Sequence, residues 1–386
     1  MKKILFLALI LLLQGCGNSD ESPRYQAEKA LFKARKMRED LASGTIKDPF
    51  LDRAIESFGD IVKNYRDDML EVEGLEEIVV SAQMDLAELE FRTRRFEASR
   101  KDFEEAIPLA AGVPPARANA IYSCGVISED MREPEKAIEY YERFVEEYFT
   151  DENFVVTAGW NTRYLIIPLT LHGLYVKMGK IDEAAGWLDR AEQLYTRLID
   201  RTESEAIRKE TRYNLLTAYL QGRKWQRSIE HIKELKRLYP EGLDMPGLLF
   251  LEAKLTDEGF GKPSQAIDQY KSVQETYPDS REAPRALLAA ADIHLREKRH
   301  DEALAIYRTV VDSYRDATAE MVQAEWQIAV ILAAQGHWNE ASLKYKEIYQ
   351  NFPRSKQGLR APIVLITHYR EKNEQDAARA AYEQAL

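Results

Sequence analysis

Apolar and aromatic side chains recur with helical spacing along most of this chain, and residues 261–280 show the pattern clearly. Ala266, Tyr270 and Val273 fall on one stripe of a helix with 3.6 residues per turn, whereas the residues between them are mostly polar. Pro278 ends the pattern, because proline cannot donate the next backbone hydrogen bond and disfavours helical geometry in the residue before it. A helix that is apolar on one side needs a packing partner, so this stretch predicts one member of a helix pair.

The same stripe returns at nearly regular intervals, and each copy begins with a small residue that we call its anchor residue. The anchor residues are Ala54, Ser99, Ala137, Ala184, Ser228, Ala266, Ala303, Ala341 and Ala378. Their spacings are 38, 37, 38 and 37 residues in the C-terminal half and 45, 38, 47 and 44 in the N-terminal half. Recurrence at this period predicts a solenoid of stacked helix pairs, with irregular repeats over 23–220 and regular repeats over 221–386.

Four residues after each anchor stands a bulky side chain, as in Ala341 and Tyr345. With Ala329 before this pair and Pro353 after it, the order is small, small, aromatic, proline, which resembles the tetratricopeptide repeat (TPR) family. Two further repeats match in part, through Ala291, Ala303 and Tyr307 and through Gly125, Ala137 and Tyr141. The period exceeds the family's 34 residues. The resemblance implies an all-α, right-handed α-solenoid of about nine TPR-like helix pairs.

One interval departs from the pattern. The 47-residue spacing contains Pro168 near the expected start of a first helix. The sequence favours either a separate helical segment ahead of this proline or a bent helix.

The N-terminus has the pattern of an export signal. Lys2 and Lys3 precede an apolar run over 4–13 that is too short to span a bilayer. The following Leu-Gln-Gly-Cys, ending at Cys16, looks like the lipobox of bacterial lipoproteins, which implies a signal peptide over 1–15, acylation of Cys16 and a lipidated tether over 16–22. Gly17 in place of aspartate resembles an outer-membrane address, with the protein facing the periplasm. The alternative is an ordinary cleavable signal that ends in Gly-Cys.

Composition and motifs argue against several chemical functions. The net charge is -11 and no concentrated basic segment exists, so nucleic acid is not an expected partner. His231 with Glu234, and His337 with Glu340, have metal-like spacing, but two ligands do not make a zinc site. The chain has no Gly-x-Ser-x-Gly nucleophile motif. We therefore expect no enzyme, no cofactor and no metal, and we expect Cys124 to be a buried structural thiol.

The TPR resemblance also implies a binding surface. In that family the first helix of each pair lines the concave face, and the residue fifteen positions before the anchor commonly points into it. Those residues are Tyr122, Leu169, Tyr213, Leu251, Leu288 and Trp326. None is lysine, so the family's basic clamp for a C-terminal carboxylate is absent. Their size and apolarity predict capture of a hydrophobic or aromatic segment; the alternative is that they pack against neighbouring helices.

Repeat endings at 277–280 and 352–355 look like those of envelope proteins such as the lipoprotein of the outer-membrane β-barrel assembly machinery and the Tol-Pal coordinator. This resemblance implies a non-catalytic scaffold that binds other envelope proteins or peptide segments, in outer-membrane protein assembly or envelope organisation. A pilus or secretion pilot lipoprotein, a cell-division coordinator, and the accessory solenoid of a peptidoglycan-cleaving enzyme remain alternatives.

Overall fold

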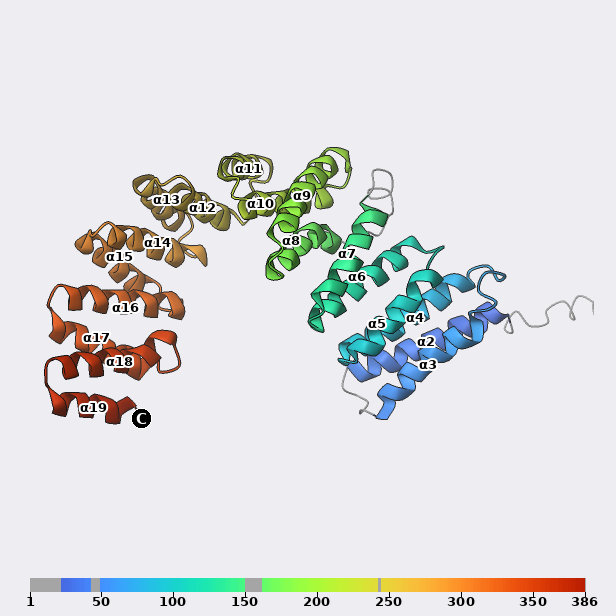
Figure 1. Ribbon diagram of the computed structural model, residues 1–386, viewed down its shortest axis with the longest axis horizontal. Helices are drawn as coiled ribbons and strands as arrows, with labels where there is room; N and C mark the ends of the chain where they lie inside the picture. Colours follow the sequence, from blue (N-terminus) through green and yellow to red (C-terminus); the bar gives the residue numbers. More distant parts are fainter. Residues whose placement is uncertain (1–21, 43–48, 150–161, 242–243, 386) are drawn as a thin grey trace, which may run out of the picture. The chain divides into compact units, whose positions relative to one another are not determined.

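The computed structural model describes residues 22–42, 49–149, 162–241 and 244–385 (Figure 1). These residues form the helices α2 to α19 and two short helical segments, η2 and η3, and they contain no β-strand. The chain divides into two compact units, residues 1–222 and residues 223–386.

Unit 1 is a run of antiparallel helices that pack in chain order. Its elements are α2 (Pro23–Ala42), α3 (Pro49–Tyr65), α4 (Leu75–Arg92), α5 (Phe96–Leu109), α6 (Pro114–Asp130), α7 (Pro134–Tyr148), η2 (Thr162–Ile166), α8 (Ile167–Lys177), α9 (Ile181–Arg201) and α10 (Glu205–Gln221). Helix α4 also packs on α2 and on α6, so the first helices of successive pairs lie side by side.

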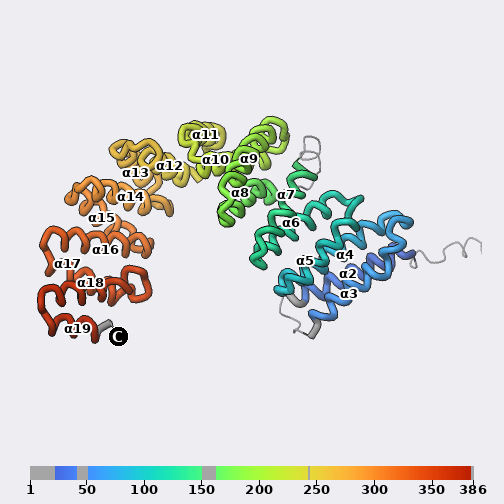
Figure 2. Tube along the Cα trace, in the orientation of Figure 1, coloured from blue at the N-terminus to red at the C-terminus, as the bar shows by residue number. Residues whose placement is uncertain are grey.

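Unit 2 repeats this arrangement with more uniform helices (Figure 2). Its elements are α11 (Trp225–Leu238), α12 (Met245–Lys254), η3 (Leu255–Gly259), α13 (Pro263–Thr276), α14 (Glu282–Arg296), α15 (His300–Ser313), α16 (Thr318–Ala334), α17 (Trp338–Asn351), α18 (Lys356–Glu371) and α19 (Gln375–Ala385). The first helices α12, α14, α16 and α18 pack on one another in that order.

Every anchor residue is buried in the second helix of its pair, from α3 to α19. The third pair shows why the residue facing the anchor must also be small. A Cβ atom added to Gly125 would lie 2.5 Å from Cε1 of Tyr141, so α6 and α7 can approach this closely only with glycine there. The predicted all-α arrangement of stacked helix pairs is confirmed in the described residues of each unit. Four pairs pack in unit 1, from α2 with α3 to α8 with α9, and four pack in unit 2, from α12 with α13 to α18 with α19.

A single left-handed residue, five positions before the anchor, joins the two helices of eight pairs. These turn residues are Arg94, Arg132, Gly179, Arg223, Gly261, Lys298, Gly336 and Asn373, with φ between 52° and 86°. In the turn that begins at Gly222, the glycine has a φ of -76°, and Arg223 takes the left-handed position instead. Backbone geometry is therefore the same from repeat to repeat even where the residue type is not.

Pro168 lies in the first turn of α8, directly after the 3₁₀ segment η2. A proline is tolerated there because the first amide groups of a helix have no partner within the helix. A helical segment does precede the proline, but it runs into α8 without a break, so the structure does not decide between the two alternatives; residues 150–161 lie outside the described residues.

The predicted signal peptide over 1–15, the acylated Cys16 and nearly all of the tether over 16–22 lie outside the described residues. Within the described ranges, no helix is both long enough and apolar enough to cross a lipid bilayer.

Candidate functional site

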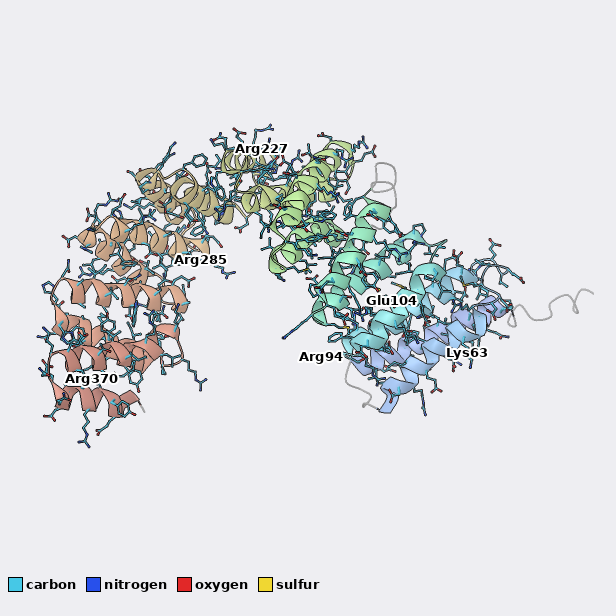
Figure 3. All side chains as sticks on the ribbon, in the orientation of Figure 1. Lys63, Arg94, Glu104, Arg227, Arg285 and Arg370 are labelled. Carbon is cyan, nitrogen blue, oxygen red and sulfur yellow. The ribbon has the colours of Figure 1, made fainter. Side chains whose placement is uncertain are left out.

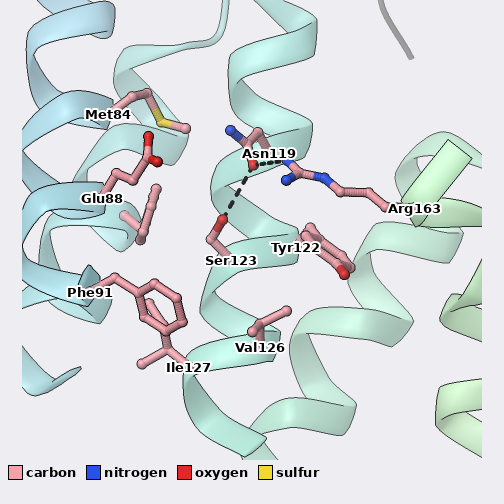
Figure 4. A pocket seen from close by; sticks show the side chains of 10 residues that line it. Met84, Glu88, Phe91, Asn119, Tyr122, Ser123, Val126, Ile127 and Arg163 are labelled. Carbon is pink, nitrogen blue, oxygen red and sulfur yellow. Dashed lines mark hydrogen bonds between the residues drawn. The ribbon is translucent and has the colours of Figure 1, made fainter. Parts of the chain in front are cut away.

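A cavity of about 230 Å³ opens between α4 and α6 in unit 1 (Figure 4). We call it the α4–α6 pocket. Its lining residues are Met84, Glu88, Phe91, Phe103, Asn119, Tyr122, Ser123, Val126, Ile127 and Arg163. Apolar side chains form much of the wall, and one carboxylate, one guanidinium, one amide and two hydroxyl groups add polar atoms, which is the usual composition of a ligand site.

The repeat register explains why these side chains converge. Met84 and Tyr122 each stand fifteen residues before an anchor, and Glu88 and Val126 each stand eleven residues before one. Equivalent positions on two adjacent first helices therefore face the same space. Phe103, four residues after its anchor, contributes from the second helix α5.

Hydrogen bonds and ring contacts hold the polar side of the pocket. Arg163 from η2 donates from Nη2 to Oδ1 of Asn119 at 2.5 Å, and Ser123 donates from Oγ to the same oxygen at 3.3 Å. The guanidinium carbon of Arg163 lies 5.1 Å from the ring centroid of Tyr122, within the range of a cation–π contact. The Tyr122 ring also meets the Tyr164 ring edge to face at 5.1 Å. These contacts fix Tyr122 before any ligand arrives.

The polar groups of the pocket can donate and accept hydrogen bonds. Burial raises the pKa of Tyr122, so its hydroxyl stays protonated and can donate a hydrogen bond. Glu88 offers a carboxylate whose Oε1 lies 3.0 Å from Nε of Arg92. The ten lining residues include no histidine or cysteine, and Ser123 bonds only an amide oxygen, which cannot act as a general base. The pocket can hold an apolar side chain and bond the backbone or polar groups beside it.

All six predicted contact residues lie on first helices: Tyr122 on α6, Leu169 on α8, Tyr213 on α10, Leu251 on α12, Leu288 on α14 and Trp326 on α16. Tyr122 lines the α4–α6 pocket. Leu169 and Leu288 are 4% and 6% exposed and belong to the cores of their units. Tyr213, Leu251 and Trp326 are half-buried. Partner contact by these residues stays a prediction.

Sequence reasoning missed most of the pocket, although the signal was present. Met84 lies fifteen residues before Ser99, the anchor of the preceding repeat, and Glu88 lies one helical turn after Met84. Asn119 and Val126 lie on the same stripe of α6 as Tyr122. Arg163 had no such signal, because η2 falls in the irregular interval.

Other candidate groups are structural. Cys124 is fully buried, and burial raises the pKa of its thiol to about 12, as expected for an unreactive thiol. His231 is buried, with Nδ1 at 3.5 Å from Oε2 of Glu234. Across the parts of the chain that the structure describes, no three His, Cys, Asp or Glu side chains are grouped to hold a metal ion.

Glu90 of α4 is a buried carboxyl with an unusual pKa. Burial raises this pKa from 4.5 to about 8, and the neighbouring Asp102 carboxyl acts in the same direction, while Arg95 and Lys101 lower it. Atom Oε2 of Glu90 has no hydrogen-bond partner among the described residues. The folded state therefore favours the protonated acid.

This shift makes stability depend on pH. Because the pKa of Glu90 is higher in the folded chain, its stabilising contribution is complete below pH 4.5 and is lost as the pH rises through about 8. We expect unit 1 to lose roughly 2–3 kcal/mol over this range, since each pKa unit corresponds to about 1.4 kcal/mol and solvent access reduces the total. Urea titrations across this range should show a flatter profile for Glu90→Gln. Equal profiles for Glu90→Gln and the native chain would contradict the assignment.

Residues 258–318 match the family model described as the tetratricopeptide repeat. This segment is therefore similar in sequence to tetratricopeptide repeats. It contains α13, α14 and α15, and arrays of such TPR units serve as protein-binding scaffolds. The TPR resemblance is thus confirmed over this segment, while the likeness to envelope lipoproteins stays a prediction.

Solved structures, among them two of proteins described as TPR proteins, are similar to the chain at low identity. A TPR protein from Parabacteroides merdae is 14% identical and aligns over 77% of this chain and 99% of its own, with a TM-score of 0.40. The C-terminal part of a TPR repeat-containing protein from Cytophaga hutchinsonii is 13% identical over 72% of this chain and 98% of its own, with a TM-score of 0.45. Yeast Tom70 is 16% identical and aligns over 96% of this chain and 65% of its own, with a TM-score of 0.40. No curated protein matches the chain.

Proposed function

We propose that this protein is a non-catalytic scaffold, anchored by lipid at Cys16 to the outer membrane and facing the periplasm. It binds segments of other envelope proteins, and its work belongs to outer-membrane protein assembly or envelope organisation. The Leu-Gln-Gly-Cys sequence at 13–16 supports the anchor, and the envelope-type repeat endings support the process.

The α4–α6 pocket is the observation that carries the binding role. It lies at the register where first helices offer side chains to a partner, and Tyr122 is held in place there by Arg163 and Tyr164. A rigid aromatic beside an apolar cavity is typical of residues that dominate binding energy. We infer that the pocket receives one large apolar side chain of an envelope protein.

Photo-crosslinking in the native cell tests this function. A photo-reactive amino acid in place of Ser123 should form adducts with envelope proteins, and Tyr122→Ala should reduce the adduct yield at least tenfold, since an aromatic anchor contributes about 2 kcal/mol or more. Glu88→Arg reverses a charge of the pocket without changing a residue of the Tyr122 ring contacts, and it should also lower the adduct yield.

A photo-reactive residue at exposed Lys101, on the second helix α5, is the matched control and should give few adducts. Cytoplasmic proteins as the main adducts at Ser123 would refute the location. Equal yields from the two positions would refute the pocket.

A further inference from the structure

Helix α2 has a row of exposed aromatic and lysine side chains, Tyr25, Lys29, Phe32, Lys33 and Lys36, which we call the α2 face. They share one side of the helix because each lies three or four residues from another member. Phe32 is 70% exposed, whereas Ala27 and Ala34 on the opposite side are fully buried in the core shared with α3 and α4. Figure 3 shows the side chains of α2 beside those of α3, where Lys63 is labelled.

The arginines and the lysines of α2 differ in their partners. Arg35 and Arg38 each place a nitrogen 2.6 Å from the carboxylate of Asp85 on α4, so their charges serve the packing of the two helices. The three lysines of the α2 face form no ion pair within the described part of the chain. Helix α2 holds six basic and three acidic residues, in a chain of net charge -11. The α2 face is therefore a local basic surface with unneutralised charge.

Nearby carboxylates do not cancel this charge. Glu28 pairs with Arg24 at 3.0 Å, and the other two acidic residues of α2, Glu39 and Asp40, lie in its last turn. The acidic segment between α3 and α4 is bonded to α2 through Arg24, which donates to the backbone oxygen of Glu73 at 3.4 Å. Because this segment joins two helices that pack on the buried side of α2, it lies away from the α2 face.

The α2 face is also close to the proposed lipid anchor. Under the proposed function the mature chain begins at the acylated Cys16, and Pro23, the first residue of α2, follows seven residues later. Seven residues span at most about 25 Å, and the 20 residues of α2 form a helix about 30 Å long. An anchor at Cys16 therefore keeps α2 beside the bilayer. The side of α2 that α3 and α4 leave uncovered is the side that can lie on it.

We propose that the α2 face lies on the anionic headgroups of the membrane into which the acyl chains of Cys16 insert. The three lysines would pair with lipid phosphates, and Phe32 and Tyr25 would enter the boundary between headgroups and acyl chains. The inference rests on the proposed anchor and adds a second membrane contact, which holds α2 parallel to the bilayer. A bilayer is favoured over a protein segment as the occupant, because the anchor brings the membrane within reach of α2 whatever partner the protein binds.

Lysine labelling of the native protein on vesicles tests the proposal. The purified protein is placed in vesicles of phosphatidylethanolamine with phosphatidylglycerol, or in micelles of a neutral detergent, and its reaction with an amine-reactive ester is followed by mass spectrometry. Lys29, Lys33 and Lys36 should react at least fivefold more slowly on the anionic vesicles. Lys101, whose side chain is 74% exposed on α5, should react equally in both. On vesicles of phosphatidylcholine alone the slowing should be less than twofold, because that headgroup has no net charge.

Substitutions at exposed positions show whether the α2 face causes the slowing. Phe32→Ser and Lys33→Glu should each raise the reactivity of Lys29 and Lys36 on the anionic vesicles at least threefold, with an unchanged melting temperature because both side chains are exposed. Lys101→Glu is the matched charge reversal and should leave the slowing as it is in the native chain.

Flotation of the vesicles in concentrated salt separates the anchor from the α2 contact, since acyl insertion is not screened by ions. A protein that floats, but whose three lysines react as fast on anionic vesicles as in micelles, would overturn the α2 contact and leave the anchor standing. Equally slow reaction in vesicles and micelles would indicate a second copy of the chain on the α2 face and would also overturn the proposal. Failure to float would refute the anchor and the α2 contact together.

Discussion

Replacing Cys16 with serine should release this protein from the membrane fraction. Each buried methylene of an acyl chain contributes about 0.8 kcal/mol to membrane attachment, so the several chains of a lipoprotein bind firmly and their loss removes the attachment altogether. Cell fractionation followed by immunoblotting should find the native protein with the outer membrane. The Cys16→Ser variant should be found as a soluble or uncleaved form.

The other cysteine supplies the control. Cys124 is buried in the core of unit 1, so Cys124→Ser should remain with the outer membrane. A wash with concentrated salt distinguishes lipid from surface charge, because ions screen electrostatic contacts and do not weaken acyl insertion. Release of the native protein by salt alone would rule out the lipoprotein assignment.

Ala303→Trp should disrupt unit 2 locally. Ala303 is fully buried in α15, in the core cluster that also contains Tyr307 and Ala329, and an indole at this position must push α14 and α16 away. Overpacking of this kind costs about 1–3 kcal/mol. In a stack where each pair contacts its neighbours, hydrogen exchange should accelerate in α14 to α17 while the helices of unit 1 keep their protection.

Ala305→Trp is the matched variant, since Ala305 is exposed on the same helix. It should leave hydrogen exchange close to that of the native chain, which would show that the position in the helix and not the new residue causes the effect. A uniform loss of protection along the whole chain in Ala303→Trp would contradict nearest-neighbour stacking and indicate one cooperative core.

The helix pairs could be predicted from the sequence because one physical requirement repeats. Where two helices cross closely, one residue must be small, and four residues later a large buried one packs against the first helix of the pair; Ala137 and Tyr141 show both. Helix ends could be predicted where proline acts directly, as at Pro278, since α13 ends before it at Thr276. The segment η2 could not be predicted in detail, since its position depends on tertiary contacts such as that between Tyr164 and Phe144.

The residues of the candidate site were harder to predict than the helix pairs, because the repeat register alone does not determine which side chains stay accessible. A register identifies which residues of a first helix share a side, but it does not say how far each one is covered by the next pair. Leu169 and Tyr122 have the same register, yet the first is covered and the second lines a cavity. Leu359 and Ile363 show the opposite case, because an apolar side chain in a helical stripe is more often buried than exposed.

The left-handed turn residues have a consequence for how such a chain can change over generations. A non-glycine residue in this conformation costs roughly 1 kcal/mol, and five of the eight turns carry Arg, Lys or Asn there. The backbone angle nevertheless stays the same, so the direction in which the second helix starts does not depend on the side chain. Architecture and stability are therefore encoded separately at this position. Substitutions there can raise or lower the stability of one pair while the path of the polypeptide, and the spacing of every surface built on it, is preserved.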